Sequence, residues 1–93
     1  MNGFIFLSNN QTMPECFDRM LFGSTWKICE KIFEIRKGCL CFLYNYDSSK
    51  LDGTFKARGS GMINIEPAAW GGRYPYQVRV EIDKANLLFI KNL

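Results

Sequence analysis

Residues 4–23, FIFLSNNQTMPECFDRMLFG, decide the fold, because four consecutive apolar residues are followed by polar residues and then by apolar residues at helical spacing. Residues 4–7 are apolar on both faces of an extended chain, which predicts a central β-strand. Asn9 and Asn10 follow as turn formers with short polar side chains. The rest of the stretch has helical spacing, so it predicts a strand followed by a helix that packs back on the sheet.

The helix has start and stop signals of its own. Thr12 has the properties of an N-cap, because Glu15 follows three residues later and completes a capping box. Pro14 falls in the first turn, where its missing N–H costs nothing. Gly23 is expected to end the helix in the left-handed conformation. One apolar face is predicted from the spacing i, i+3, i+4, i+7 and i+8, namely Met13, Cys16, Phe17, Met20 and Leu21.

The middle of the chain predicts a short helix and a β-hairpin. Residues 26–35 favour the helix, with an extended chain over residues 33–36 as the alternative. CLCFLYNY, residues 39–46, is the strongest strand signal, with apolar side chains on both faces. Residues 47–50 predict a hairpin loop and residues 51–60 the returning strand.

The last third predicts one helical turn and two strands. Residues 59–72, GSGMINIEPAAWGG, indicate a loop or short strand that leads to the turn, with Pro67 at its first position and two glycines at its end. Residues 86–90 predict a last strand, with a helix as the alternative. Residues 76–82 alternate, which predicts Tyr76, Val78, Val80 and Ile82 inward and Gln77, Arg79 and Glu81 outward.

These elements predict a single α+β domain over residues 1–93. Five or six strands with two or three short helices imply a small bent mixed sheet or a partly open barrel. The composition is globular, with 47% hydrophobic and 23% charged residues. No apolar run approaches the ~20 residues of a membrane helix, and no signal-peptide pattern is present. We therefore expect a cytoplasmic protein without a membrane partner.

Cysteine and histidine usage argues against a metal site and against catalysis. The four cysteines stand among apolar neighbours without Cys-x2-4-Cys spacing, which predicts free structural thiols in a reducing compartment. The absence of histidine removes the catalytic triads and the usual general base near neutral pH. No paired carboxylates replace them. The sequence therefore predicts a protein that is not an enzyme and that has no cofactor.

The net charge of +3 is concentrated in one segment. Residues 1–49 hold five basic and five acidic groups, and residues 80–93 hold two of each. Residues 50–79 hold five basic groups against Asp52 and Glu66. Outward-facing basic side chains beside aromatic ones are typical of surfaces that hold phosphates and stack bases. The alternative is an ordinary solvated face with the aromatic side chains in the core.

Four blocks of the chain resemble the successive signature blocks of the development and cell death domain. They are GFIFLSNNQTMPECFDRMLFG, FLYNYDSSKLDGTFKA, NIEPAAW and RYPYQVRV, in order between about residues 3 and 83. The chain has Ser24-Thr25 and Tyr76 where that family usually has Leu-Pro and Ala. The resemblance implies a protein-interaction module of a stress-response type, without established catalytic activity.

A second pattern resembles the PUA-like and YTH-like domains. Its parts are a strand ending in Ser-Asn, a helix, a tryptophan, and a hairpin of the form Lys-Leu-x-Gly-x-Phe-x-Ala. Those domains are small barrels that bind RNA or a modified base, so this likeness implies a PUA-like barrel.

The leading hypothesis is a non-catalytic binding module for RNA or a nucleotide-like ligand, and the alternative is a protein-protein interaction module. The sequence makes no prediction of the oligomeric state. The candidate ligand-binding residues are Asn9, Asn10, Trp26, Tyr46, Lys56, Arg58, Trp70 and Arg79.

Overall fold

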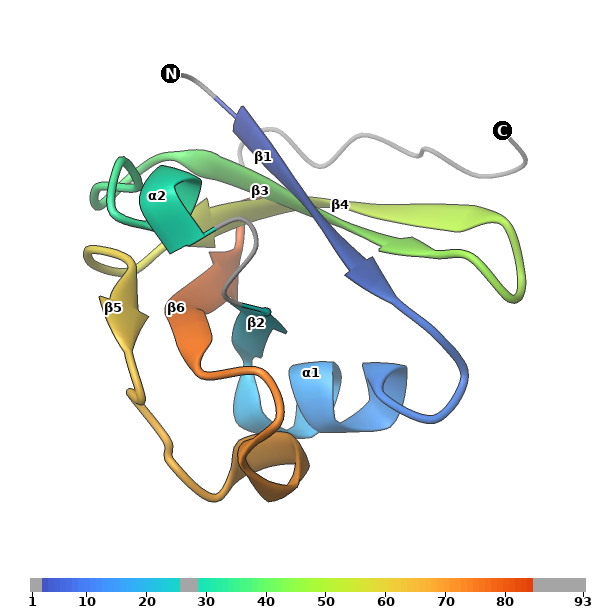
Figure 1. Cartoon of the computed structure of the whole chain (residues 1–93). Helices are drawn as coiled ribbons and strands as arrows, with labels where there is room; N and C mark the ends of the chain where they lie inside the picture. The colour runs from blue at the N-terminus through green and yellow to red at the C-terminus, as the bar shows by residue number, and fades with distance from the viewer. Residues whose placement is uncertain (1–2, 26–28, 85–93) are drawn as a thin grey trace.

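The computed structural model describes residues 3–25 and 29–84, and the predicted strand at 86–90 lies outside this part. Six strands, two short α-helices and one 3-10 helix make up the described chain (Figure 1). Their bounds, in chain order, are β1 Gly3–Ser8, α1 Met13–Arg19, β2 Leu21–Ser24, α2 Cys29–Ile32, β3 Leu40–Asn45, β4 Lys50–Ala57, β5 Met62–Ile63, η2 Ala69–Gly72 and β6 Tyr76–Ile82.

The strands form one curled sheet in the order β1-β3-β4-β6-β2, with β5 paired to β6. β1 runs parallel to β3, and all other pairs are antiparallel. The sheet curls until its two end strands, β1 and β2, come into contact, which gives a nearly closed barrel. The predicted α+β class and the small, partly open barrel are therefore confirmed.

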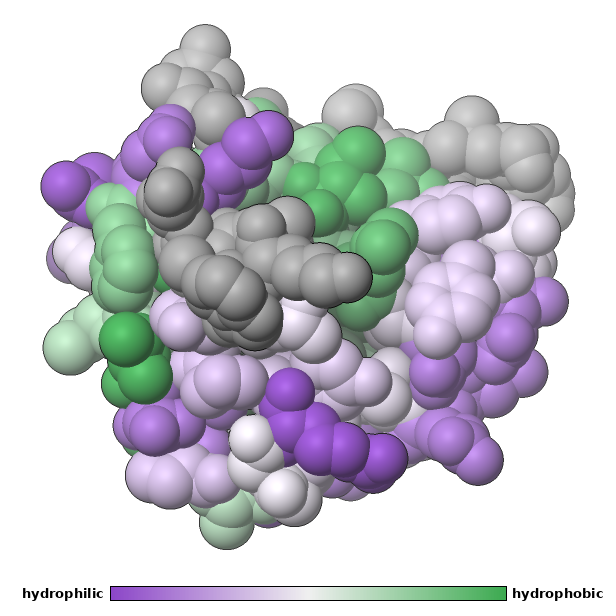
Figure 2. Space-filling view, viewed as in Figure 1, coloured by the Kyte–Doolittle hydropathy of each residue, from purple (hydrophilic) through white to green (hydrophobic). Residues whose placement is uncertain are grey.

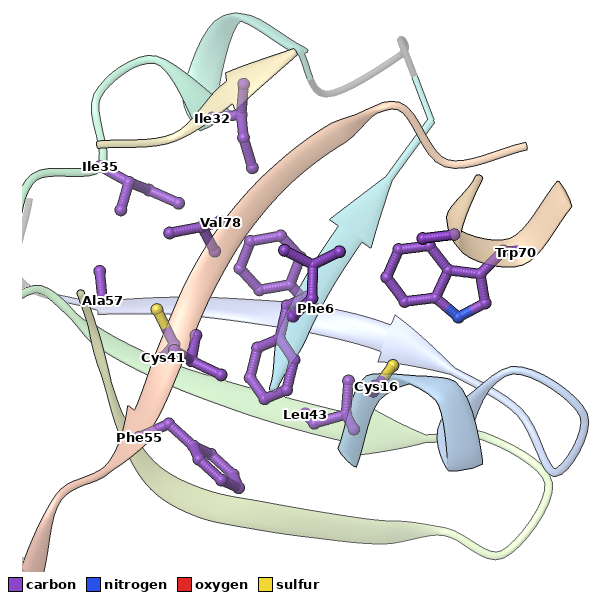
Figure 3. Close-up of a cluster of buried hydrophobic side chains, with 14 residues drawn as sticks. Phe6, Cys16, Ile32, Ile35, Cys41, Leu43, Phe55, Ala57, Trp70 and Val78 are labelled. Atoms are coloured by element: carbon purple, nitrogen blue, oxygen red, sulfur yellow. The ribbon is translucent and has the colours of Figure 1, made fainter. Parts of the chain in front are cut away.

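The barrel interior is filled by aromatic and aliphatic side chains (Figure 3). Phe22 is fully buried, and its ring lies 5.6 Å from that of Phe6 and 5.1 Å, edge-on, from that of Phe55. Residues 39–46 were predicted to be apolar on both faces, and burial alternates along β3, with Cys41 and Leu43 buried and their neighbours half-buried. Burial of this apolar surface is the main term that stabilises the fold.

A buried asparagine fixes the β3–β4 hairpin. Asn45 is fully buried, and its Oδ1 accepts hydrogen bonds from the backbone N–H groups of Asp47 and Ser48 at 2.9 and 3.2 Å. This is the Asx pattern that allows a short polar side chain to close a turn. The Asn45 Nδ2 donates to Asn10 Oδ1 at 3.0 Å, which ties the hairpin to the loop after β1.

The helix α1 ends earlier than predicted. Met20, and not Gly23, adopts the left-handed conformation, with φ 49° and ψ 54°, and its N–H donates to the last turn. The chain then enters β2 at once, so Leu21 is a core strand residue. Phe17 was predicted on the buried face, yet it is 36% exposed, because a helix of this length buries only Cys16.

The predicted capping box is wrong. Thr12 occupies the N-cap position without a side-chain cap bond, and its Oγ1 accepts instead from the N–H of Asn9 at 3.0 Å. The Oδ1 of Asn9 accepts from the N–H groups of Gln11 and Thr12 at 2.8 and 2.9 Å. The Glu15 carboxylate binds Trp70 and Arg19 rather than the N-cap. Asn9 therefore organises the loop that starts the helix.

Two residues of β6 depart from the predicted alternation. Gln77 was predicted outward but is 1% exposed, because its amide bridges the backbone of Glu66 and the carbonyl of Tyr74. Ile82 was predicted inward but is 50% exposed, since β6 reaches the end of the barrel there. The predicted helical turn is present as η2, but it begins at Ala69 and not at Pro67, and its two glycines have positive φ.

Candidate functional site

The contact between β1 and β2 forms a seam without a hydrogen-bonded ladder among the described residues, since these strands lie at the two ends of the sheet order. One half of the seam is filled by the Phe6 and Phe22 rings. The other half holds a pocket of about 360 Å³. It is lined by β1 and the loop after it, by α1, by the end of β2 and by three aromatic side chains: Leu7, Ser8, Asn9, Thr12, Cys16, Gly23, Ser24, Thr25, Tyr46, Trp70 and Tyr74.

The pocket exists because small residues occupy inward positions of the seam. Ser8 and Ser24 are buried two residues beyond the phenylalanines that fill the other half. Gly23, which lies between Phe22 and Ser24 on β2, has no side chain, and a Cβ placed there would lie 2.6 Å from Trp70 Cζ3. The absence of a Cβ at this position thus lets the indole ring close one end of the pocket.

Trp70 is a fixed wall of the pocket and is only 5% exposed. Its Nε1 donates to the carbonyl of Thr12 at 3.0 Å, and its backbone N–H donates to Glu15 Oε2 at 2.6 Å. The Tyr74 ring packs edge-on against the indole at 5.8 Å. These contacts join η2 to α1 and set the orientation of the aromatic wall.

Asn9 and Tyr46 stand together at the mouth. The Asn9 Nδ2 donates to Tyr46 Oη at 2.9 Å, and Tyr46 is 54% exposed. Because the tyrosine oxygen accepts this bond, its own hydroxyl hydrogen is left to donate. Asn10 is turned away from the pocket, where its N–H donates to Asp47 Oδ2 at 2.9 Å.

The strand edges place backbone groups in the seam. The carbonyl of Ser8 accepts from Tyr46 N at 3.0 Å, so strand alternation points the N–H and C=O of Leu7 away from β3. The N–H of Val80 donates to Met20 O at 3.0 Å, so the same alternation points the backbone of Gly23 away from β6. Leu7 and Gly23 both line the pocket, which therefore carries peptide donors and acceptors.

Among the residues that the structure describes, the pocket lining has no acidic or basic side chain, and the one thiol among them, Cys16, is neutral. Burial raises the pKa of Cys16 to about 12. The exposed Arg73 adjoins the aromatic wall, because its Nε donates to Trp70 O at 3.3 Å and Tyr74 follows it in the chain. The site is thus an uncharged pocket with the cationic side chain of Arg73 beside it.

The predicted basic residues gather on a different face. Lys56 pairs with Glu81 in the β4–β6 register, and the N–H of Arg58 donates to Arg79 O at 2.8 Å. Arg58 lies 3.7 Å from the Glu81 carboxylate, so acidic groups share this face. Lys56 pairs with Leu40 at the start of β3, roughly 20 Å along that strand from the mouth of the pocket.

Arg79 belongs to a network of ion pairs. Its Nη1 lies 2.6 Å from Glu66 Oε2 and donates to the carbonyl of Arg19 at 2.8 Å. Arg19 contacts the other oxygen of Glu66 and, at 2.9 Å, Glu15. The hydrogen bond from Arg19 is the main cause that holds the pKa of Glu66 below its ordinary value, and that same bond raises the pKa of Arg19. Arg79 therefore has a structural use that the sequence did not indicate.

The structure thus brings Asn9, Tyr46 and Trp70 together and leaves the basic group apart, while Trp26 lies outside the described residues. Arg73 and eight of the lining residues were not predicted as ligand contacts. One of the eight, Gly23, had a detectable signal, an isolated glycine within an apolar run, but it was interpreted as a helix end. The other seven are Leu7, Ser8, Thr12, Cys16, Ser24, Thr25 and Tyr74.

The cysteines that can be placed have no metal-like arrangement. Cys16 and Cys41 are buried free thiols, and burial raises the pKa of each to about 12. The Sγ of Cys39 accepts from the N–H of Arg36 at 3.3 Å, and the side chain of Cys29 is not described. Within the described ranges, no group of three potential metal ligands is present.

Comparison with known proteins identifies the family. The model of the development and cell death domain matches residues 2–91. The chain is 40% identical over 87 residues to the B2 protein of Daucus carota, covering 86% of this chain and 42% of that protein. The DCD domain-containing protein NRP-B of Glycine max is also 40% identical over 87 residues, covering 86% of this chain and 26% of that protein.

The corresponding protein NRP of Arabidopsis thaliana is 37% identical over 86 residues, covering 85% of this chain and 25% of that protein. The chain thus spans less than half the length of these curated relatives. The family match covers the loop after β1, the β3–β4 hairpin and η2, which all contribute residues to the pocket. The chain belongs to the development and cell death domain family.

Proposed function

We propose that this domain is a non-catalytic binding module for single-stranded RNA or a nucleotide-like ligand, and that the seam pocket is its binding site. The observation that carries the proposal is an uncharged, partly aromatic pocket with an exposed arginine beside its wall. Its volume lies near the small end of the range for ligand pockets, about 300–1,000 Å³, which suits one base or nucleoside.

The chemistry of the lining supports binding rather than catalysis. The Cys16 thiol has a pKa of about 12, so it is not a thiolate nucleophile near neutral pH. The Ser8 hydroxyl donates to the carbonyl of Tyr44 at 3.3 Å, so its hydrogen is directed at a peptide oxygen rather than at a general base.

A titration of the protein with fluorescent single-stranded RNA at several salt concentrations tests the proposal. We expect saturable binding that weakens with salt, because phosphate contacts release counterions. Arg73→Gln should weaken binding and flatten the salt dependence. Lys37→Gln, an exposed cation in the loop before β3, is the matched control and should leave both unchanged. Absence of RNA binding by the wild type at physiological salt would contradict the proposal.

A protein-interaction module of the stress-response type is the second candidate, and an apolar patch favours it. Ile5 and Leu7 on β1 are 59% and 67% exposed. Figure 2 shows a hydrophobic patch over the region where β1 runs in Figure 1. Leu7 also lines the pocket, so the patch adjoins it. Ile5→Lys should abolish binding to a protein partner and leave RNA affinity unaffected or slightly raised, which separates the two candidates.

We also propose a cytoplasmic location. The free thiols of Cys16 and Cys41 support a reducing compartment. No described helix has the length and apolar character needed to cross a membrane. Fluorescence microscopy of the tagged protein would test the location directly.

A further inference from the structure

We propose that the seam pocket takes the uncharged base of its ligand edgewise and leaves the phosphates outside beside Arg73. This inference rests on the proposed function and adds which part of the ligand enters and what recognises it. According to this inference, the ligand is recognised by the strand edges of β1 and β2 at the seam. The basic face of β4 and β6 does not contact it.

The walls of the pocket favour a planar group. The Tyr46 ring stands at the mouth, and the indole of Trp70 closes the far end with Tyr74 packed against it. Because Trp70 is held by hydrogen bonds from both its indole and its backbone, the wall is formed before any ligand arrives. A preformed aromatic wall costs less entropy on binding than one that must be ordered.

The strand edges supply the polar contacts. Alternation points the backbone N–H and C=O groups of Leu7 and Gly23 into the seam from opposite sides. The Tyr46 hydroxyl adds a donor, because its oxygen already accepts from Asn9. Together these groups offer donors and acceptors close to one another, which matches the mixed donor and acceptor edge of a nucleobase.

Charge decides which part of the ligand enters. An isolated phosphate would have to lose its water in a hollow whose described lining residues include no cation, at a cost that none of these residues offsets. A neutral base carries no such cost. Arg73, held outside the indole wall by its bond to Trp70 O, is placed for the attached phosphate.

The experiment is an NMR titration of the ¹⁵N-labelled chain with three classes of probe, namely nucleosides, phosphates and N-acetyl-tryptophanamide as a mimic of a protein side chain. Adenosine, uridine, cytidine and guanosine are the uncharged probes, and ribose 5-phosphate and inorganic phosphate are the charged ones. We expect at least one nucleoside to shift the amide signals of Leu7 and Gly23 and the indole N–H signal of Trp70. The two phosphates should leave these signals unchanged and shift only signals close to Arg73.

Substitution tests the same idea with RNA. Tyr46→Ala should weaken binding of single-stranded RNA at least about fivefold, the lower end of what loss of one base stack costs. Tyr46→Phe keeps the ring and should weaken it less. Tyr44→Phe, two residues earlier on β3 and absent from the pocket lining, is the matched control and should bind like the wild type.

The outcomes separate this inference from the proposed function. If RNA binds while nucleosides shift nothing and Tyr46→Ala binds normally, the inference is wrong and the proposed function stands. If N-acetyl-tryptophanamide shifts the pocket signals and no nucleoside does, the pocket takes a protein side chain and the inference is wrong. If the wild type binds no RNA at all, the proposed function fails. Shifts of the pocket signals by nucleosides alone support the inference.

Discussion

The two halves of the seam between β1 and β2 differ in one inward-facing residue on each strand, which is a phenylalanine in one half and a serine in the other. In the filled half, Phe6 faces Phe22 with ring centroids 5.6 Å apart. Two residues further along each strand, on the same inward faces, Ser8 and Ser24 take their places, and a pocket of about 360 Å³ opens. Where this barrel lacks a hydrogen-bonded ladder, side-chain size thus decides whether the seam is filled core or an open pocket.

This contrast predicts that the filled half dominates stability. Phe22→Ala should lower the free energy of unfolding by about 3–5 kcal/mol, because it removes a fully buried ring that contacts two others and leaves a cavity. Phe17→Ala is the comparison, and at 36% exposure it should cost only about 1–2 kcal/mol. Urea denaturation measures both values. Equal costs would show that the aromatic packing at the seam is not what holds the barrel together.

The hollow half should be sensitive to added atoms rather than to lost ones. Gly23→Ala places a Cβ 2.6 Å from Trp70 Cζ3 and 3.0 Å from Tyr74 O, so the aromatic wall must move. We expect a loss of about 1–3 kcal/mol in the free energy of unfolding, as for an overpacked core. Gly59→Ala is the control, because nothing lies within 4 Å of its added Cβ. An unchanged Trp70 indole N–H signal in Gly23→Ala would show that the wall does not rest on Gly23.

Most elements of the fold could be predicted from local patterns, but the place of β1 and the pocket could not. Residues 4–7 were predicted as a central strand, yet β1 ends the sheet order, and Ile5 and Leu7 on its outer face are exposed. The apolar run at residues 39–46 and the polar residues at 47–50 were enough to place the β3–β4 hairpin. The seam depends on which two strands end the sheet order, which no local pattern contains.

The errors have the same cause. Gly23 was interpreted as a helix end, although its role depends on an indole 47 residues later in the chain. Gln77 was predicted outward, since only the tertiary structure brings the Glu66 backbone to its amide.

The loop between β1 and α1, which borders the hollow half, should depend more on Asn9 than on Thr12. Asn9→Ala removes the acceptor for two backbone N–H groups and the bond to Tyr46, so we expect a loss of about 1–2 kcal/mol. Thr12→Ala removes one acceptor and should cost about 0.5–1.5 kcal/mol. Thermal unfolding of both variants gives the order. A larger effect of Thr12→Ala would restore the capping box that the sequence predicted.

The smallest expected effect concerns the ion pairs that hold η2 and the Trp70 wall to α1 and β6. The hydrogen bond from Arg19 lowers the pKa of Glu66 below its ordinary value of 4.5. A carboxyl whose pKa is lowered by folding stabilises the fold above its unfolded pKa and loses that contribution as pH falls through its folded pKa. These groups are partly exposed, so water and salt screen the pairs and the effect is modest.

Glu66→Gln should therefore lower the melting temperature at pH 7. The difference from the wild type should shrink as pH falls below about 4.5, because protonated Glu66 and glutamine are both neutral. Glu34→Gln, which changes an exposed carboxylate on the chain after α2, is the control and should show no such convergence. Melting temperatures of the three proteins between pH 3 and 7 decide the point. A constant gap between Glu66→Gln and the wild type across that range would mean that the charge of Glu66 does not hold the aromatic wall in place.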